Sequence, residues 1–261
     1  MSARAIWKGK IRFGGVSVPV KLFSAVVDRK VHFRLLHTSD HTPVEQRMVD
    51  PRTGDPVPGE RIRRGLETEP GEIVMIRDEE LDRLVPEASR EIEITRFVDA
   101  ERVAYQLYDR PYILGPDGNT ENYYSLAKAL EKENKKGIAR WTMRKKQYVG
   151  VLEANRGFLE LCTFRYAGEV VDATAIPRPS GRKLEPMELR MAEQLVDALA
   201  AGFDPAAYHD EYRDRVMDLI SAKARGEKYP FREEKKPRPA PASLAESLEQ
   251  SLRRAREEQH A

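Results

Sequence analysis

The chain of 261 residues contains a single cysteine, Cys162, so no disulfide can form within it. We interpret Cys162, in the alternating stretch "FLELCTFRY", as a packed core thiol rather than a nucleophile. No apolar run approaches the roughly 20 residues that a membrane-spanning helix needs. The N-terminal stretch "MSARAIWKGKIRF" also lacks the apolar segment of a signal peptide. We therefore expect a cytoplasmic protein that does not associate with membranes.

The common enzyme motifs are absent as well: the chain has no GxxxxGK[ST], no GxGxxG after a strand, no GxSxG and no HExxH. His37 and His41 lie in a proline-rich segment without a nearby cysteine, which favours polar loop groups over zinc ligands. A group of acids could in principle hold Mg²⁺ for a nuclease: Asp78, Glu79, Glu80 and Asp82. Acids at a helix start also stabilise its dipole and free amides. We expect no enzyme activity, no cofactor and no metal, with the nuclease as an alternative.

Positive charge is unevenly distributed, although the formal net charge is only +2. Residues 1–64 carry a net charge of +7 and residues 132–165 carry +6, whereas residues 65–131 carry −9 and residues 166–261 carry −2. If folding brings the two basic blocks onto one surface, that surface attracts a polyanion. The acidic block would keep the remainder of the protein from binding to it.

Alternation of apolar and polar residues predicts a β-rich body. The opening stretch "IWKGKIRFGGVSVPVKLFSAVV" is broken by Gly14, Gly15 and Pro19, as half-buried strands with bends are. Further strands are predicted at "VHFRLLH", "EIVMIRD", "REIEITRFV", "YQLYDRPYIL", "YVGVLEA" and "FLELCTFRY". Trp7 and Trp141 follow the same alternation, so we expect both in the core.

Residues 38–68 have a different composition, with four prolines and hardly any large apolar side chain, so they cannot fill a core. A loop of this length inside a compact domain is usually functional or disordered. "DPRTGD" is predicted to form the tip of a projecting hairpin. The segment carries five arginines: Arg47, Arg52, Arg61, Arg63 and Arg64.

Helices are predicted at "DEELDRLV" and at "TENYYSLAKALEKENKKG", the second running from a Thr120 cap to a stop at Gly137. Apolar residues then recur every four positions from Met187, and Asp204 and Pro205 are predicted to cap a further helix. These two amphipathic helices form an arm. The arm covers either the body of its own subunit or a second subunit, and the sequence leaves both open.

The last part of the chain begins with "EKYPFREEKKPRPAPA", which predicts an extended, solvated linker. "SLAESLEQSLRRAREE" follows, with a capping box of Ser243 and Glu246 and leucines four residues apart at Leu244, Leu248 and Leu252. A helix too short to be stable alone that presents one leucine stripe is either a docking peptide for a partner groove or a disordered end.

The basic block "GIARWTMRKKQYVGV", residues 137–151, places Arg140, Arg144, Lys145 and Lys146 between apolar residues. Alone, such a block is more typical of a solvated turn. Lysines and arginines spread over strands and a projecting loop, without a helix-turn-helix or finger motif, favour contacts to phosphates over contacts to base edges. Single-strand binders need exposed aromatic rings, which the pattern does not predict. We therefore expect sequence-independent binding of duplex DNA.

The segments taken together resemble the bacterial Ku family, the DNA-end-binding proteins of non-homologous end joining. The resemblance covers almost the whole chain and lies in "RAIWKGKIRFGGVSVPVKLFSA", "FRLLH", "EIVMIRDEELDRL", "REIEITRFVD", "YILGPD", "KKGIARWTMRKKQYVGVL", "MAEQLVDAL" and "FDPAAYHDEYRDRVMDLISAKARGE", in that order. It implies a β-rich α+β fold: a seven-stranded antiparallel β-barrel core with an inserted bridge loop and a C-terminal helical arm. It also implies a nucleoid-associated homodimer that forms a ring around a duplex end, has no nuclease or ATPase site, and recruits DNA ligase D.

Carried onto this chain, the resemblance implies a core at residues 1–180 with the bridge at about 38–68, an arm at 181–227, and a linker with a tail helix at 228–261. The five bridge arginines would line the hole, and the basic side chains of residues 137–151 would grip backbone phosphates. The first strands add weaker candidates for DNA binding: Lys8, Lys10, Arg12 and Lys21. The leucine-striped tail helix would contact ligase D.

Two features depart from the family pattern. Many relatives carry paired cysteines in the bridge that look like a zinc site, whereas "HTSDHTPVEQRMVDPRTGDP" has none, so we predict no metal there. The chain also lacks the long lysine-rich tail of some relatives, which puts tail-driven DNA binding in doubt. Besides the nuclease, a repair scaffold that binds only protein is the other alternative.

Overall fold

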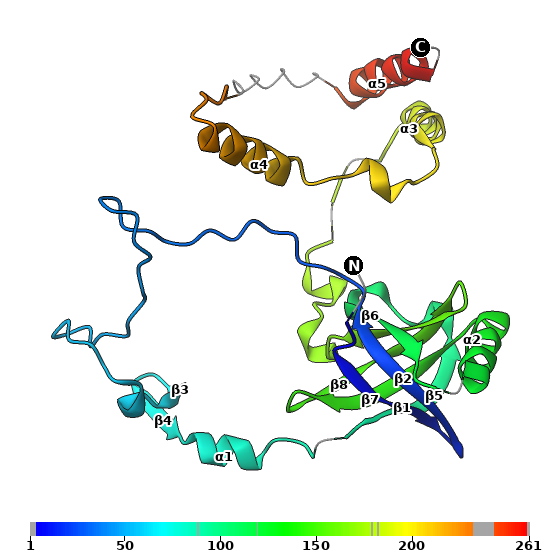
Figure 1. The fold of residues 1–261 in the computed structure, drawn as a ribbon. Coiled ribbons are helices and arrows are strands. Elements are labelled where there is room, and N and C mark those ends of the chain that lie inside the picture. The colour runs from blue at the N-terminus through cyan, green and yellow to red at the C-terminus, as the bar shows by residue number, and fades with distance from the viewer. Residues whose placement is uncertain are drawn as a thin grey trace. The chain divides into compact units, whose positions relative to one another are not determined.

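A computed structural model describes residues 4–87, 89–118, 120–178, 180–181, 183–231 and 243–259. The chain divides into two compact units, residues 1–175 and residues 176–261. The first unit contains all the strands and two of the α-helices, and the second contains the remaining α-helices of the described chain (Figure 1). No helix in the described ranges is both long and apolar enough to cross a lipid bilayer.

Seven strands of the first unit close into a barrel in the order β1-β2-β6-β9-β8-β7-β5. This confirms the predicted seven-stranded barrel. Their bounds are Trp7–Phe13 for β1, Val16–Ser24 for β2, Glu91–Asp99 for β5, Tyr108–Pro116 for β6, Lys135–Met143 for β7, Lys146–Asn155 for β8 and Phe158–Phe164 for β9.

The barrel is mixed rather than wholly antiparallel, because β1 and β5 run parallel while the other six neighbouring pairs are antiparallel. Strand direction cannot alternate all the way around a ring with an odd number of strands. A closed barrel of seven strands must therefore contain at least one parallel pair, and here it is the pair of β1 and β5.

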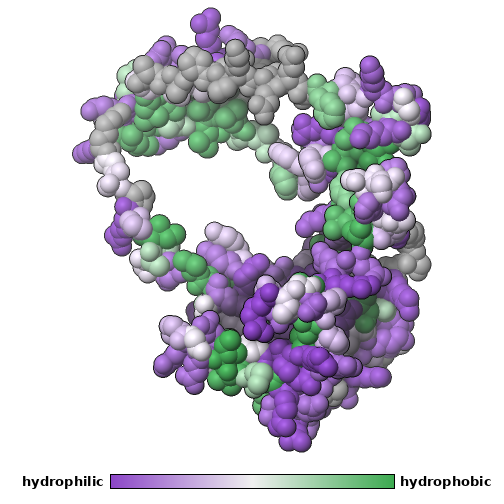
Figure 2. Space-filling model, turned by 90° about the vertical axis from the view of Figure 1, so that its left-hand side faces the viewer, coloured by the Kyte–Doolittle hydropathy of each residue, from purple (hydrophilic) through white to green (hydrophobic). Residues whose placement is uncertain are grey.

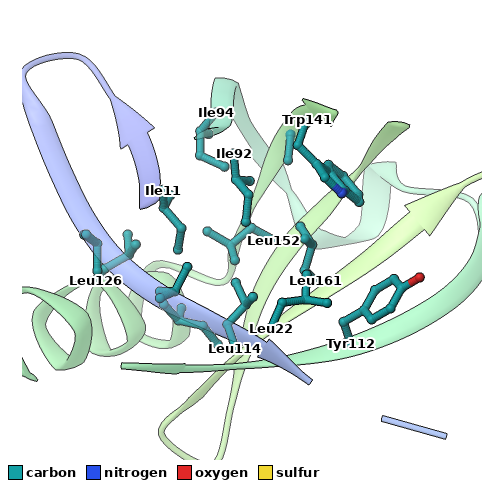
Figure 3. Packing of buried hydrophobic residues seen from close by; sticks show 14 of the residues in the cluster. Ile11, Leu22, Ile92, Ile94, Tyr112, Leu114, Leu126, Trp141, Leu152 and Leu161 are labelled. Carbon is teal, nitrogen blue, oxygen red and sulfur yellow. The ribbon is translucent and has the colours of Figure 1, made fainter. Parts of the chain in front are cut away.

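The core lies inside the barrel and receives side chains from all seven strands, as Figure 3 shows. Helix α2, Thr120–Glu133, adds Leu126 to this cluster. The buried hydroxyl of Tyr123 joins α2 to the barrel, because it donates to the carbonyl of Leu114 and accepts from the amide of Leu159 at 2.8 Å. Trp141 is buried as predicted, and Trp7 packs half-buried against the same cluster.

Between β2 and β5 the chain forms a long insertion with little regular structure (Figure 1). It contains the 3-10 turn η1 at Gly59–Arg61, a two-stranded sheet of β3 at Arg64–Glu69 and β4 at Glu72–Ile76, and helix α1 at Asp78–Arg83. The predicted turn at "DPRTGD" is present: the amide of Asp50 donates to the carbonyl of Asp55 at 2.9 Å.

Four expectations about element positions were wrong, three of them in the barrel unit. "VHFRLLH" forms no strand and contributes only an isolated bridge between Leu36 and Pro43, while β3 forms inside the segment expected to be loop. Helix α2 ends at Glu133 rather than at Gly137, because Lys135 already belongs to β7. Gly137 lies in that strand.

The barrel unit also contains the 3-10 turns η2 at Ala100–Arg102, η3 at Tyr105–Leu107, η4 at Ala167–Glu169 and η5 at Ala173–Ala175. The second unit contains α3 at Pro186–Leu199, the 3-10 turn η6 at Pro205–Ala207, α4 at Glu211–Ala224 and α5 at Leu244–Gln259. Asp204 caps only η6, which is the fourth difference from the predicted elements. Helix α4 is capped by Asp210, whose side chain accepts from the amide of Arg213.

The tail helix has its predicted cap, since the amide of Glu246 donates to the hydroxyl of Ser243 at 3.2 Å. The predicted linker falls largely on residues 232–242, which lie outside the described residues.

Candidate nucleic-acid interface

The hairpin of β7 and β8 presents the basic block at its tip. Met143 pairs with Lys146, so the loop contains only Arg144 and Lys145, with φ values of 52° and 63°. Two positive φ values in a two-residue loop define a type I′ turn, which matches the twist of the strands but favours asparagine and glycine. An arginine and a lysine here cost on the order of 1 kcal/mol each in backbone strain. The two cationic residues at the tip thus have an unfavourable backbone conformation.

The four cations of the hairpin have different surroundings. Arg140 lies on the outer face of β7, because the alternate residues Ala139 and Trp141 are buried. Arg140 and Arg144 form no ion pair within the part of the chain that the structure describes. Lys146 lies over the ring of Tyr148, with its ammonium 5.5 Å from the ring centroid.

The remaining cation of the tip, Lys145, joins the hairpin to the insertion through an ion pair of 2.8 Å with Asp82 of α1. The hydrogen bond from Lys145 is the main cause that lowers the pKa of Asp82. Both side chains are more than half exposed, so the pair contributes little to stability. Lys145 can therefore exchange this carboxylate for a phosphate at small cost.

A second basic group lies on the outer faces of β1 and β2. Strand alternation directs Lys8, Lys10 and Arg12 outward, and the strand register places Lys21 opposite Lys8. These four cations share two carboxylates. Lys8 and Lys21 lie 3.8 and 2.7 Å from Asp117.

The other pair, Lys10 and Arg12, lies 3.1 and 2.9 Å from Glu91. Hydrogen bonds lower the pKa of both carboxyls, mainly from Lys21 to Asp117 and from Lys10 to Glu91. Each carboxylate therefore stays ionised at neutral pH. Each carboxylate carries one negative charge and faces two cations. Each set of two cations and one carboxylate therefore keeps a net charge of +1.

A hollow of about 420 Å³ connects the second group with the hairpin. Its lining includes Arg12 of β1, Glu93 of β5 and Arg140 of β7, which are aligned in register across the three strands. Thr142 and Gln147, a cross-strand pair, line the same hollow. Arg12 and Arg140, one from each basic group identified from the sequence, thus border the same hollow of the barrel. The neutral hydrogen-bonding residues were missed, although Thr142 could have been found from its alternation with Arg140.

The arginines of the insertion are exposed and engaged locally. Arg47 pairs with Glu45 at 3.8 Å, and Arg52 pairs with Asp50 at 3.4 Å. Arg63 donates to the carbonyl of Glu60 at 2.6 Å and to that of Ile62 at 2.9 Å.

Arg64 lies 3.5 Å from Asp78. Arg61, in η1, forms no ion pair among the described residues. Within those residues, no ion pair joins any of the five arginines to the barrel. Their role in lining a hole stays a prediction.

The acidic residues of α1 are arranged around different cations. Asp78 pairs with Arg64, Glu80 with Arg77 at 2.9 Å, and Asp82 with Lys145. Glu79 lies in the first turn of the helix, as the capping interpretation expects. No group of three or more histidines, cysteines or acids that could hold a metal occurs in the described ranges.

The remaining polar candidates have structural surroundings. His37 lies in a turn, where its Nδ1 is 2.7 Å from the hydroxyl of Ser39, and His41 donates its amide to the carbonyl of His37. Cys162 is 6% exposed, and burial raises the pKa of its thiol. The side-chain surroundings of Cys162 are thus those of a core residue.

Comparison with known proteins agrees with this architecture. Residues 12–191 match the family model described as "Ku70/Ku80 beta-barrel domain". The chain belongs to the Ku family. It is 36% identical over 255 residues to the non-homologous end joining protein Ku 2 of Geotalea uraniireducens, a match that covers 97% of this chain and 99% of the relative.

Other Ku relatives match at similar levels. Identity is 39% over 222 residues with the non-homologous end joining protein Ku 3 of Saccharopolyspora erythraea, covering 82% of this chain and 83% of the relative. It is 34% over 228 residues with the non-homologous end joining protein Ku of Mycobacterium tuberculosis, covering 85% and 84%. This Ku-family chain thus matches its relatives over both of its units.

Proposed function

We propose that this chain binds the ends of double-stranded DNA in the repair of double-strand breaks by non-homologous end joining. The observation that carries the proposal is the surface between β1 and the β7–β8 hairpin, where Arg12 and Arg140, one from each basic group, border one hollow. Its cations lie on strands and in a strained turn, not on a helix that could enter the major groove. Contacts from such a surface reach phosphates, so binding is independent of sequence.

The working form of the protein in this proposal is a homodimer. Support comes from the sheet of β3 and β4, in which every residue except Ile76 is exposed. Ile73 and Met75, two positions apart and so on one face of β4, are 66% and 74% exposed. A two-stranded sheet without cover is marginally stable in water. A second copy of the chain that covers these side chains would contribute about 1.5–3 kcal/mol for each one fully buried.

Two insertions joined in this way would close a ring, and the bridge arginines Arg47, Arg52, Arg61, Arg63 and Arg64 would line it. A closed ring accepts only a DNA molecule with a free end. Affinity then comes from the phosphates and end preference comes from topology. The C-terminal helix α5, with Leu244, Leu248 and Leu252, is proposed to recruit DNA ligase D.

Competition between DNA forms tests the proposal. A labelled linear duplex is challenged with unlabelled linear duplex or with covalently closed circles of the same sequence. The linear competitor should displace the label and the closed circles should not. Equal competition by both would refute end binding, and absence of any binding would favour a scaffold that binds only protein. Cleavage of the label in Mg²⁺ that a Glu80→Ala variant loses would instead favour a nuclease.

A further inference from the structure

Helices α3 and α5 of the second unit pack against each other (Figure 1). On α5 the packed side includes the buried residues Leu252 and Ala255, while Leu248 is half-buried and Leu244 is 45% exposed. On α3 Glu188 is buried and Met191 is half-buried. A helix of this length is marginal in isolation, so its contact with α3 stabilises it. Leu252 and Ala255 thus hold α5 in place beside α3, whereas Leu244 stays exposed.

A groove of about 1140 Å³ lies between the two helices. Its apolar part comes from both helices: Met187, Met191, Ala245 and Leu252. Met187 is 67% exposed, and flexible methionine side chains are common in grooves that bind amphipathic helices. Met187 and Ala245 are exposed and Met191 is half-buried, so these three residues offer a partner an apolar surface, whereas Leu252 is buried.

The polar lining of the same groove is strongly acidic. Among the described residues it contains five glutamates, Glu185, Glu188, Glu246, Glu249 and Glu257, against a single arginine, Arg253. That arginine is engaged by Glu257 at 3.3 Å. The charged lining therefore has a formal net charge of −4. A negative rim around an apolar surface attracts a cationic amphipathic segment and repels DNA.

We propose that the α3–α5 groove docks a basic amphipathic helix of a partner protein, with its apolar side chains on Met187, Met191 and Ala245 and its lysines or arginines at the glutamate rim. The inference deepens the proposed recruitment of ligase D and rests on it for the identity of the partner. Hydrophilic residues cover most of the face visible in Figure 2, with hydrophobic residues exposed in separate patches. The docking groove is acidic and the DNA-binding surface of the barrel is basic. Each site therefore attracts a partner that the other repels, and one protein can bind both partners.

Charge reversal on α5 tests the inference in the full-length protein. Glu246 and Glu249 are exposed and line the groove, and the test variant is Glu246→Lys/Glu249→Lys. The matched control is Glu193→Lys/Asp197→Lys, which reverses two exposed acids of α3 outside the groove lining. A milder variant, Glu246→Gln/Glu249→Gln, keeps the test decisive if the reversed protein does not fold.

Two probes are measured by fluorescence anisotropy: a synthetic leucine–lysine amphipathic peptide with its leucine–glutamate counterpart, and purified ligase D. We expect the lysine peptide to bind the wild type and the control alike, to bind the reversed variant at least tenfold more weakly, and to bind the glutamine variant with intermediate affinity. The glutamate peptide should not bind. Ligase D should follow the lysine peptide, and affinity for linear duplex should be unchanged.

The failures of the two proposals are distinguishable. If ligase D binds all variants equally and the lysine peptide fails to discriminate, the groove is refuted while recruitment stands. If the lysine peptide follows the expected order but ligase D does not bind the wild type, recruitment is refuted and the groove stands. Loss of self-association in the reversed variant, without any change in peptide affinity, would assign the groove to a second copy of this chain and overturn the inference.

Discussion

Replacing the hairpin turn Arg144-Lys145 by Asn-Gly should raise stability while it lowers DNA affinity. Both residues have positive φ values, where a side chain other than that of glycine or asparagine costs on the order of 1 kcal/mol. Asparagine tolerates this conformation, and glycine adopts it freely at an entropic cost of about 0.5–1 kcal/mol. The lost ion pair between Lys145 and Asp82 is exposed and contributes about 0–1 kcal/mol.

The net expectation is a gain of about 1 kcal/mol in the free energy of unfolding of the barrel unit, or a rise in Tm of about 2–4 °C. Binding should change in the opposite direction. If each side chain contacts one phosphate in both protomers of a dimer, the variant loses four contacts. With about 0.9 per phosphate, the slope of log affinity against log salt becomes shallower by about 3.6.

Thermal unfolding and a salt series of DNA titrations measure the two effects. The matched control is Arg156→Asn in the β8–β9 hairpin, where Arg156 and Gly157 have φ values of 49° and 80°. It relieves the same kind of strain outside the predicted DNA contacts, so it should stabilise without changing the salt slope. A lower Tm in the Asn-Gly variant would refute the strain argument. An unchanged slope would show that the tip does not contact phosphates.

Three further predictions follow from the same geometry. Tyr123→Phe should destabilise the barrel by about 1–3 kcal/mol in chemical denaturation, because two buried backbone groups of β6 and β9 lose their partner; an unchanged midpoint would contradict this. Interactions with Lys10 and Arg12 lower the pKa of Glu91 below its ordinary value of 4.5, so this carboxyl contributes stability that is present above that pH and lost as pH falls through the folded-state pKa. Stability should therefore fall less steeply on acidification below pH 4.5 in Glu91→Gln than in the wild type, as acid titrations followed by circular dichroism would measure, and equal steepness would argue against the contribution. Ile73→Ser/Met75→Ser should shift the protein from dimer to monomer in sedimentation, whereas a dimer unchanged in affinity would exclude the β3–β4 sheet as its interface.

The barrel could be predicted from the sequence because its strands alternate clearly and because the resemblance supplied their number. Lys8, Lys10 and Arg12 recur at every second position, and the strand places all three on its outer side. Their shared carboxylates could not be predicted. Glu91 follows Lys10 by about eighty positions in the chain, and only the parallel pairing of β1 and β5 brings them together.

The misplaced elements also have physical explanations. The residues after Glu133 have side chains that favour a helix. Lys135 nevertheless pairs with Asp99 of β5 and begins β7, so tertiary contacts override local propensity. The strand β3 is short and mostly polar, so its own sequence does not predict a strand. It forms by pairing with β4. The turn at Arg144 and Lys145 lacks the usual Asn-Gly pattern, so its strain was visible only in the backbone dihedrals.

Topological linkage between the protein and DNA tests the ring most directly. The protein is loaded onto a linear duplex, the ends are ligated to form a closed circle, and the salt concentration is then raised until electrostatic contacts to phosphates are lost. The proposed ring predicts that the protein stays with the circle in high salt and is released when a restriction enzyme opens it. Release from the closed circle in high salt, at the same rate as from a linear duplex, would contradict the account.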